Sequence, residues 1–513
     1  MATRSIARGA GAPPAPVPVA SGGLARLPGG IPRALPAYLL LLTVLVAHVV
    51  LLLGVFPALR EDIQLRGSLR LFFLDSSRTL SGAVPYRDFL LEYPPGSLLV
   101  MVLPNLFAPG FLAYRAAYFV EMTILDCIMV ATLFAIARTA RLSTLRVLGL
   151  YTAGILLLGP MIEYRLDLAP AVLTALTILA WQRRWMAPAA LVLAAGVATK
   201  AYPLILLPPL VFDAWREGGV RRLATTLLTF VVALGAFLGP LLLAGSEGIA
   251  NALRFQLDRH LQVESIWATI PLLAHRIGGF PLEVVGRERA LVVLGPGDAA
   301  GQQGTLVLIV VTVAVYARWG LRRRGLRRRG DARGLPTSTD LALGDEVAPE
   351  PLSPRGAVLV GPRMGPDMAL FAGSATLLLA VTLLSKVLSP QYLLWALPGL
   401  AMLPLRSWRA IVAVVLFLAA LPLTQWIYPL HYGELVRLIT PRAVGVLALR
   451  NLLLVLAFIA LLSLRWGDGR RPQRRVMPSS LAPPPSLSPV SPPISASPEP
   501  ARPRPSSAQG RGE

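Results

Sequence analysis

The sequence has few charged residues for its length, and almost no cysteine or lysine. Only 15% of its 513 residues are charged, whereas 55% are hydrophobic. This composition is too apolar for a soluble protein of this size and excludes a string of soluble domains. The single cysteine, Cys127, lies within an apolar run, so a disulfide framework and a thiolate metal site are both excluded. Lys200 and Lys386 are the only lysines, and arginine therefore supplies nearly all of the positive charge behind the formal net charge of +22.

Several catalytic motifs are also absent. The sequence contains no Gly-rich phosphate loop with its lysine, no Gly-x-Ser-x-Gly and no His-Glu-x-x-His. Nucleotide-driven and zinc-dependent chemistry therefore have no support from motifs. A pI of about 11.2 can indicate nucleic-acid binding. Here the arginines lie in short clusters between apolar runs, as in the cytoplasmic loops of a polytopic membrane protein, so we predict no nucleic-acid partner.

Apolar runs recur from residue 37 onward and predict an all-α, polytopic membrane protein. The first, residues 37–56, would form a helix about 30 Å long, which matches the hydrocarbon thickness of a bilayer. Several later runs are short and contain proline, which predicts broken or tilted helices inside the bundle. We predict twelve spans: 37–56, 114–137, 145–161, 168–181, 187–199, 201–214, 223–245, 304–320, 367–385, 391–405, 408–426 and 440–464.

Arginine placement predicts the orientation of these spans. Short cytoplasmic loops collect arginine and lysine, whereas exported loops do not. If the N-terminus is cytoplasmic and 96–112 is a re-entrant or interfacial helix, the arginine clusters between spans fall on the cytoplasmic side, as does the C-terminus. Residues 36–465 would form the membrane domain. Three segments rich in Pro, Gly, Ser or Arg are predicted to be disordered and cytoplasmic: 1–35, the loop 321–365 and the tail 466–513.

With this topology, the polar residues that are hardest to explain as loop solubility all lie on the outer face. Several carboxylates there could take a proton, and several cations could hold a phosphate. This combination suits transfer of a group from a lipid-linked phosphate. The outer-face candidates include Asp62, Asp88, Glu92, Lys200, Arg259 and Lys386.

Each of these residues also has a structural interpretation. A loop carboxylate can cap a helix or pair with a neighbouring arginine, and a lone lysine near the interface can snorkel to water. The two outer-loop histidines, His260 and His431, are not spaced as metal ligands, so we predict no metal site. The convergence of so many polar residues on one face favours a functional interpretation.

Five motifs follow one another along this outer face. They are Pro85-Tyr86-Arg87-Asp88-Phe89 followed by Glu92-Tyr93-Pro94-Pro95; Arg165-x-Asp167-x-x-Pro170; Lys200-x-Tyr202-Pro203-Leu204; Arg259-x-x-Gln262-x-Glu264-Ser265; and Ser389-Pro390-Gln391-Tyr392. In this order the motifs resemble the signature of glycosyltransferase family 87, over about residues 37–465. Its members are bacterial integral-membrane enzymes of the GT-C architecture and include polyprenol-phosphate-mannose-dependent mannosyltransferases.

The resemblance implies transfer of a sugar, mannose in the family, from a polyprenyl-phosphate donor to a lipid- or glycan-linked acceptor. The reaction would invert the anomeric centre on the outer face of a bacterial plasma membrane, without cofactor or metal. An acidic residue of the first outer loop would be the general base: Asp62 fits best, Asp88 and Glu92 are alternatives, and counting without a gap places Ser68 there. Lys200, Arg259 and Lys386 would hold the donor phosphate. Residues implied to contact substrate are Tyr86, Arg87, Tyr93, Arg165, Asp167, Tyr202, His260, Gln262, Glu264, Gln391, Tyr392 and His431.

Three other functions fit parts of the sequence. A transporter or lipid-linked glycan flippase also has many spans with charged residues, but such carriers bind near the midplane and usually show related halves. No internal repeat is visible here. A polymerase or ligase of lipid-linked glycans shares the architecture and differs mainly in its acceptor. A non-catalytic scaffold would be favoured if Asp62, Asp88 and Glu92 proved dispensable.

Overall fold

The computed structural model describes residues 35–464, apart from 60–62, 109, 258, 288–289, 295 and 332–366. The chain divides into two units, Met1–Asp468 and Gly469–Glu513. The second unit lies outside the described residues, as do Asp62 and most of the three segments predicted to be disordered. The fold described below is that of the first unit.

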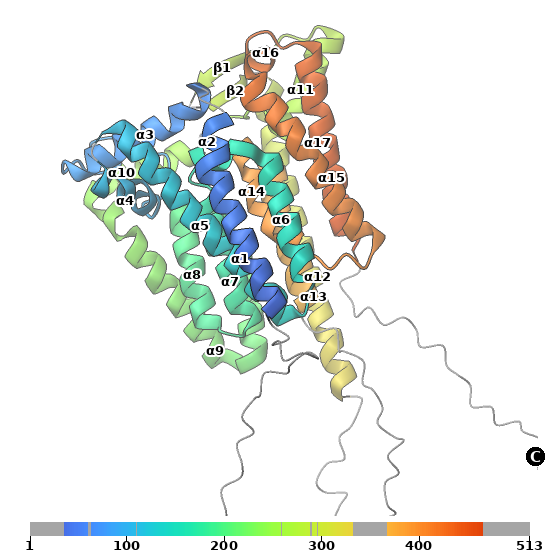
Figure 1. Ribbon diagram of the computed structural model, residues 1–513. Helices are drawn as coiled ribbons and strands as arrows, with labels where there is room; N and C mark the ends of the chain where they lie inside the picture. Colours follow the sequence, from blue (N-terminus) through green and yellow to red (C-terminus); the bar gives the residue numbers. More distant parts are fainter. Residues whose placement is uncertain are drawn as a thin grey trace, which may run out of the picture. The chain divides into compact units, whose positions relative to one another are not determined.

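Helices account for most of the described residues of this unit (Figure 1). The elements are, in order, α1 (Leu35–Val50), η1 (Leu51–Val55), α2 (Phe56–Leu59), α3 (Ile63–Leu80), α4 (Ser97–Phe107), α5 (Phe111–Ala140), α6 (Thr144–Leu158), η2 (Gly159–Tyr164), α7 (Leu168–Gln182), α8 (Met186–Thr199), η3 (Tyr202–Leu206), α9 (Leu207–Leu238), η4 (Gly239–Ala244), α10 (Gly245–Leu257), α11 (Ile266–Gly278), β1 (Glu283–Arg287), β2 (Ala290–Leu294), α12 (Pro296–Asp331), α13 (Asp367–Leu384), η5 (Pro390–Tyr392), α14 (Leu393–Ala401), α15 (Trp408–Gln425), η6 (Trp426–Leu430), α16 (Tyr432–Val436) and α17 (Pro441–Leu462).

The predicted helical membrane protein is confirmed at this level. Within the described residues, seven helical stretches are long and apolar enough to cross a membrane, and four further apolar helices are shorter. The sequence did not predict the antiparallel hairpin β1–β2, in which Glu283 pairs with Leu294, or the helices α3, α10 and α11. The seven stretches are Leu35–Ala58, Phe111–Ala140, Thr144–Tyr164, Tyr202–Leu238, Gln303–Leu321, Trp408–Leu430 and Pro441–Leu462.

Several predicted boundaries differ from the structure. The predicted spans 201–214 and 223–245 fall largely in α9, which is interrupted by non-helical backbone at Gly218 and Gly219. The predicted span 391–405 contains only the nine-residue α14, which at about 14 Å is too short to cross a bilayer. Helix α12 continues to Asp331, beyond the predicted boundary at 321, because leucine and arginine are good helix formers. Helix α4, within 96–112, has 11 residues and is also too short to cross.

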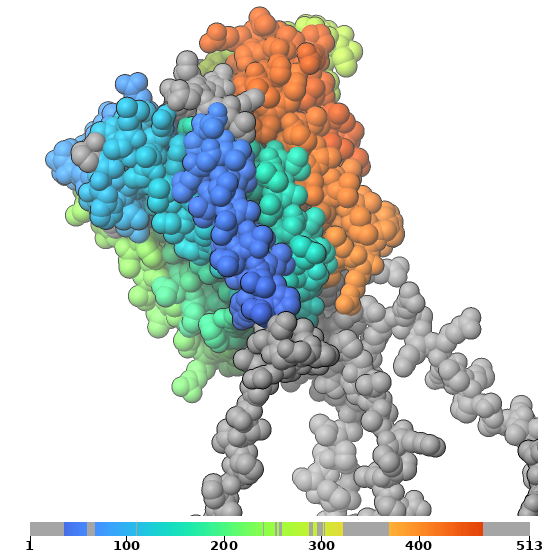
Figure 2. Space-filling view, in the orientation of Figure 1, coloured from blue at the N-terminus to red at the C-terminus, as the bar shows by residue number. Residues whose placement is uncertain are grey.

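Helix α1 lies along the outside of the bundle, and most of its apolar side chains are exposed (Figure 2). His48 is the residue of this helix that is buried. Its Nδ1 lies 2.5 Å from Asp126 Oδ2 on α5, and its Nε2 lies 2.9 Å from Thr152 Oγ1 on α6. The hydroxyl of Tyr151 donates to Asp126 Oδ1 at 2.6 Å. This buried polar cluster therefore connects α1 to the interior.

Removing the shared acceptor of this cluster should destabilise the protein. Asp126→Ala leaves His48 and Tyr151 without their buried partner, at a cost of about 1–3 kcal/mol for each orphaned group. We expect a lower melting temperature in detergent. Thr43→Ala is the matched control on α1, because Thr43 is exposed and bonds only to the backbone of Leu39, and it should change stability by less than about 0.5 kcal/mol. Equal melting temperatures for both variants would contradict this role.

The two ends of the bundle differ in character. At one end Arg318 of α12 donates to the carbonyl oxygens of Leu462 and Leu464, and Arg184 pairs with Glu217 beside the break in α9. At the other end lie β1, β2, α11 and α16, at the top of Figure 1. These elements were predicted to be outer loops, and β1, β2 and α16 contribute residues to the wall of the cavity described below.

Candidate functional site

A large cavity opens among the elements that follow the predicted outer loops. Its volume is about 1340 Å³, which is ample for a drug-sized or larger ligand. Its walls carry the cations Arg165, Lys200, Arg259, Lys386 and Arg437, against the carboxylates Glu92 and Glu264. Most of the predicted site residues meet here: Glu92, Tyr93, Arg165, Lys200, Tyr202, Arg259, Gln262, Glu264, Lys386, Gln391 and Tyr392. The excess of cations favours an anionic ligand.

Lys200 is the most closely enclosed of these cations. It directly follows α8 and is only 9% exposed. Its ammonium nitrogen lies 4.4 Å from the ring centroid of Tyr392, 5.0 Å from that of Trp395 and 5.4 Å from that of Tyr93. Aromatic faces attract a cation at such distances and restrict its position. The ammonium group is therefore fixed at the cavity wall.

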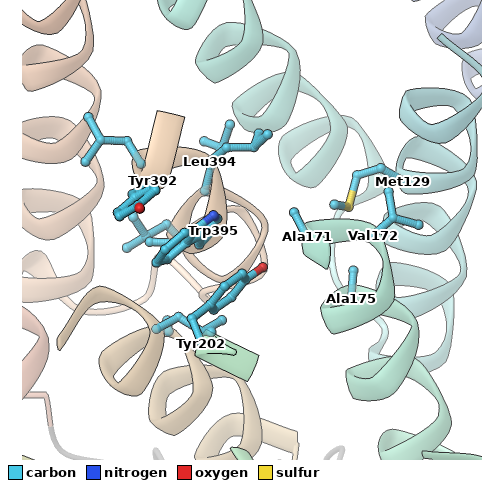
Figure 3. Close-up of a cluster of buried hydrophobic side chains, with 14 of the residues drawn as sticks. Met129, Ala171, Val172, Ala175, Tyr202, Tyr392, Leu394 and Trp395 are labelled. Atoms are coloured by element: carbon cyan, nitrogen blue, oxygen red, sulfur yellow. The ribbon is translucent and has the colours of Figure 1, made fainter. Parts of the chain in front are cut away.

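The ring of Trp395 lies between those of Tyr202 and Tyr392, as Figure 3 shows. Ring centroids are 4.0 Å apart for Tyr202 and Trp395 and 3.9 Å apart for Tyr392 and Trp395. Tyr392 and Trp395 are three residues apart at the start of α14, and this spacing places them on the same face of a helix. The short helix thus supports the enclosure of Lys200.

Asp167 lies behind Lys200 and does not line the cavity. Its Oδ1 accepts hydrogen bonds from Lys200 Nζ at 2.6 Å and from Trp395 Nε1 at 2.7 Å. The carboxylate is 1% exposed, so water does not screen its attraction for the ammonium group. Asp167 was predicted to contact substrate, but its position indicates a role in orienting Lys200.

The loop that carries Glu92 and Tyr93 is fixed to the end of α8. The backbone nitrogen of Gly96 donates to the carbonyl oxygen of Ala198 at 2.9 Å. A Cβ at position 96 would lie 2.7 Å from that oxygen, so only glycine fits without movement. This contact sets the distance between two walls of the cavity.

Gly96→Ala should therefore impair the site without unfolding the bundle. The added methyl group must push the loop away from α8, and displacements of about 1 Å near a reacting centre can cost about 10²-fold in rate. We expect at least a tenfold loss of the activity proposed below, measured on purified protein at matched amounts. Gly149→Ala is the control, because a Cβ there meets nothing within 4 Å. Full activity in Gly96→Ala would refute the positioning role.

A second wall holds Arg259, Gln262 and Lys386 together. The backbone nitrogen of Gln262 donates to the carbonyl oxygen of Lys386 at 3.1 Å, and its side-chain Nε2 donates to Ser389 Oγ at 3.0 Å. The backbone of the same loop also bonds to strand β2. The unpredicted hairpin thus supports residues that were predicted to act together.

Arg165 lines the cavity next to α3. Its guanidinium donates to Ser68 Oγ and, at 2.8 Å, to the hydroxyl of Tyr428. Ser68, Tyr428 and Tyr432 all line the cavity. Ser68, the position that ungapped counting assigns to the base, is therefore at the site, but it carries a hydroxyl instead of a carboxylate.

Other predicted residues lie away from the cavity walls. Tyr86 is buried and donates to the carbonyl oxygen of Tyr93, and Arg87 pairs with Asp88 at 2.9 Å. The Arg87 hydrogen bond, together with that from the Val84 backbone, lowers the pKa of Asp88 to about 2. Asp88 is thus a weak base in an exposed ion pair, and the structure does not place Asp88, Tyr86 or Arg87 on the cavity wall.

Neither of the predicted histidines, His260 and His431, lines the cavity. The ring centroid of His431 lies 3.9 Å from that of Trp426, and its Nδ1 bonds to the Trp426 carbonyl oxygen. His260 is half-buried in the connection between α10 and α11. The cavity-lining residues that the sequence did not predict include the aromatic residues Tyr428 and Tyr432 and the cation Arg437. Tyr428 and Tyr432 flank His431 in the sequence, and their spacing of four residues could have indicated a shared helical face.

The cavity also has an apolar part. Leu204, Ile205 and Pro208 line it from η3 and α9, together with Tyr316 of α12 and Val381 of α13. The hydroxyl of Tyr316 donates to the Ile205 carbonyl oxygen at 2.7 Å, which connects α12 to η3. Both Tyr202–Leu238 and Gln303–Leu321 are candidate membrane spans. The cationic chamber therefore continues into a region bordered by membrane-spanning helices.

No group of three or more His, Cys, Asp or Glu residues placed to hold a metal ion occurs in the part of the chain that the structure describes. No protein-family model matches this chain, and no curated protein is significantly similar to it. The interpretation of the site therefore depends on its own geometry and on the motifs in the sequence.

Proposed function

We propose that this protein is a membrane glycosyltransferase that moves a sugar from a polyprenyl-phosphate donor to a lipid- or glycan-linked acceptor. One observation carries the proposal: Lys200, Arg259 and Lys386, chosen from sequence as phosphate ligands, line one cavity that continues between apolar helices. A phosphate needs fixed cations, and a polyprenyl chain needs an apolar groove. The cavity offers both within one continuous space.

The chemistry is a single displacement at the anomeric carbon. The acceptor oxygen forms a bond to that carbon as the bond to the phosphate oxygen breaks, and the leaving electron pair stays on polyprenyl phosphate. Lys200, Arg259 and Lys386 offset the negative charge that develops there, as preorganised charge does in other enzymes. The proton of the acceptor hydroxyl passes to a carboxylate. Rings such as Tyr93 and Tyr392 offer faces on which a sugar can stack.

The candidate bases have unequal support. Glu92 lines the cavity, whereas Asp88 is exposed and paired with Arg87, and Asp62 lies outside the described residues. We propose mannose as the sugar, inversion as the stereochemical course, and the outer face of a bacterial plasma membrane as the location, all on the strength of the motif resemblance. The GT-C architecture belongs to the same proposal.

A transporter or flippase is the alternative. It is favoured by the same pairing of a charged chamber with membrane-spanning helices. The two functions differ in outcome, because a flippase moves the donor unchanged whereas a transferase breaks its sugar–phosphate bond.

The proposal is tested in membranes from cells that produce the protein, supplied with a panel of radiolabelled polyprenyl-phosphate sugars. We expect one donor to label a new product. Variants Asp62→Asn and Glu92→Gln, compared with Asp88→Asn as the exposed control, show which acid of the first outer loop matters. No labelled product from any donor would refute the transferase, and translocation of an intact donor would favour the flippase.

A further inference from the structure

Glu264 occupies an unusual position in the cavity wall. It lies in the loop just before α11, and the next residue, Ser265, caps that helix by accepting a hydrogen bond from the Ala268 backbone at 3.1 Å. The Glu264 side chain is 1% exposed yet lines the cavity. A carboxylate buried this deeply and facing a ligand space is costly unless neighbouring groups stabilise it.

Those neighbours include a fully buried arginine. Arg450 is 0% exposed and lies in the middle of α17, a candidate membrane span. Its Nη2 donates to the Glu264 carbonyl oxygen at 3.2 Å and lies 3.8 Å from Glu264 Oε2. Its Nε and Nη1 have no hydrogen-bond partner among the described residues. An arginine at membrane depth is expensive, and such residues are usually functional.

The backbone around Glu264 is fixed by hydrogen bonds, whereas one oxygen of its carboxylate has no hydrogen-bond partner among the described residues. Glu264 Oε2 has no hydrogen-bond partner among the described residues, whereas the backbone around it is fixed by Arg450 and by Asn451, which donates to the Ser265 carbonyl oxygen at 3.3 Å. The charged and titratable groups that act on Glu264 are Arg450 from α17, Arg165 beside η2, and Tyr432 from α16, with Tyr428 next to Tyr432.

Burial raises the pKa of Glu264 to about 7, although Arg450, the Tyr432 hydrogen bond and Arg165 each pull it down. A carboxyl with a pKa near neutrality can both take and release a proton at physiological pH. Because Arg165 acts on Glu264, the carboxyl group lies near the part of the cavity where Arg165 donates to Ser68. Ser68 is the residue that ungapped counting places where the family has its carboxylate.

We propose that Glu264 accepts the proton of the acceptor hydroxyl and that Arg450 is the residue that positions it. This inference rests on the proposed glycosyltransferase function and replaces the first outer loop as the source of the base. The acceptor O–H bond breaks toward a Glu264 carboxylate oxygen while the acceptor oxygen forms its bond to the anomeric carbon. The electron pair of the broken sugar–phosphate bond leaves with polyprenyl phosphate, and Glu264 later releases its proton to water.

The test compares three variants of the full-length protein in reconstituted membranes, using the polyprenyl-phosphate sugar that labels product with wild type. Glu264→Gln should lower kcat by about 10²–10⁴-fold, the usual contribution of general-base catalysis. Wild-type activity should rise with pH through about 7, because the carboxylate form is the base, and the residual activity of Glu264→Gln should lose that rise. Arg450→Met should move the inflection to higher pH, because Arg450 lowers the pKa of Glu264.

The double variant Glu264→Gln, Arg450→Met separates catalysis from folding. It removes both charges of a buried pair, so neither is left uncompensated, and it should fold even where a single variant does not. We expect the double variant to stay at least 10²-fold below wild type. Asn451→Ala is the structural control, since it loosens the loop without touching the carboxylate, and its pH inflection should not move.

Distinct results overturn this proposal and the proposed function. Absence of transfer by the wild-type protein refutes the function itself, and the assignment of Glu264 with it. If the wild-type protein transfers sugar and either Glu264→Gln or the double variant keeps more than a tenth of the wild-type rate, Glu264 is not the base, although the transferase function stands. The same conclusion follows if Glu264→Gln keeps the wild-type pH profile. In that case Asp62→Asn or Glu92→Gln should show the loss instead.

Discussion

Lys200→Met should reduce sugar transfer by about 10²–10³-fold, the loss typical when one preorganised group that stabilises developing charge is removed. Methionine keeps the length and apolar stem of the side chain but not its ammonium group. The surrounding rings of Tyr93, Tyr392 and Trp395 should therefore remain in place. The loss should fall on kcat, because the lysine acts most strongly on charge that develops as the phosphate leaves.

The matched control is Arg183→Met, which removes a surface cation that lies 5.2 Å from the Trp185 ring in the α7–α8 connection, far from the cavity walls. Its transfer rate should be unchanged. Lys200→Arg keeps the positive charge but tests the shape of the enclosure, because a guanidinium is larger than an ammonium group and does not fit a space enclosed by three rings. Wild-type rates in Lys200→Met, with the protein folded, would remove Lys200 from the phosphate site.

Asp167→Asn should cost about 10²-fold through its effect on Lys200. The buried carboxylate accepts hydrogen bonds from both Lys200 Nζ and Trp395 Nε1, and the neutral amide would remove the negative charge that pairs with Lys200 at 2.6 Å. Without it the ammonium group loses its orientation toward the cavity. Asp167→Glu keeps the charge and should recover part of the rate.

The coupling between these residues gives a sharper readout than either rate alone. If Asp167 acts only through Lys200, the double variant Asp167→Asn, Lys200→Met should be no slower than Lys200→Met itself. If the double variant instead loses rate by the product of the two single-variant factors, Asp167 contributes independently of Lys200. Such a result would contradict the role assigned to it here and support direct contact with substrate.

The helical membrane class could be predicted from the sequence, because apolar runs separated by arginine clusters have few other solutions. The individual spans could not. Hydropathy does not distinguish an exposed helix such as α1 from α14, whose nine residues are all buried in protein. The break at Gly218–Gly219 and the hairpin β1–β2 depend on tertiary contacts that a run of residue types does not contain.

The sequence predicted many of the residues that line the candidate site, but not which of them contact one another. Lys200 and Lys386 could be singled out because they are the only lysines of the chain, and Arg259 because it lies in one of the five ordered motifs. Trp395 and Arg450 could not, because each lies inside an apolar run and its polar partner is distant in sequence: Asp167 for Trp395 and Glu264 for Arg450. Asp88 was named as a candidate base because a motif shows that Arg87 and Asp88 are adjacent, but not that their side chains pair with each other.

The central claim is that the cavity breaks a sugar–phosphate bond and transfers the sugar. The most direct test is to reconstitute the purified protein in lipid vesicles with a labelled polyprenyl-phosphate sugar and an acceptor, and to quantify released polyprenyl phosphate and glycosylated acceptor together. The account predicts equal amounts of the two products, formed by wild type and lost in Lys200→Met. Donor that is recovered intact, or products that Lys200→Met forms at the wild-type rate, would contradict it.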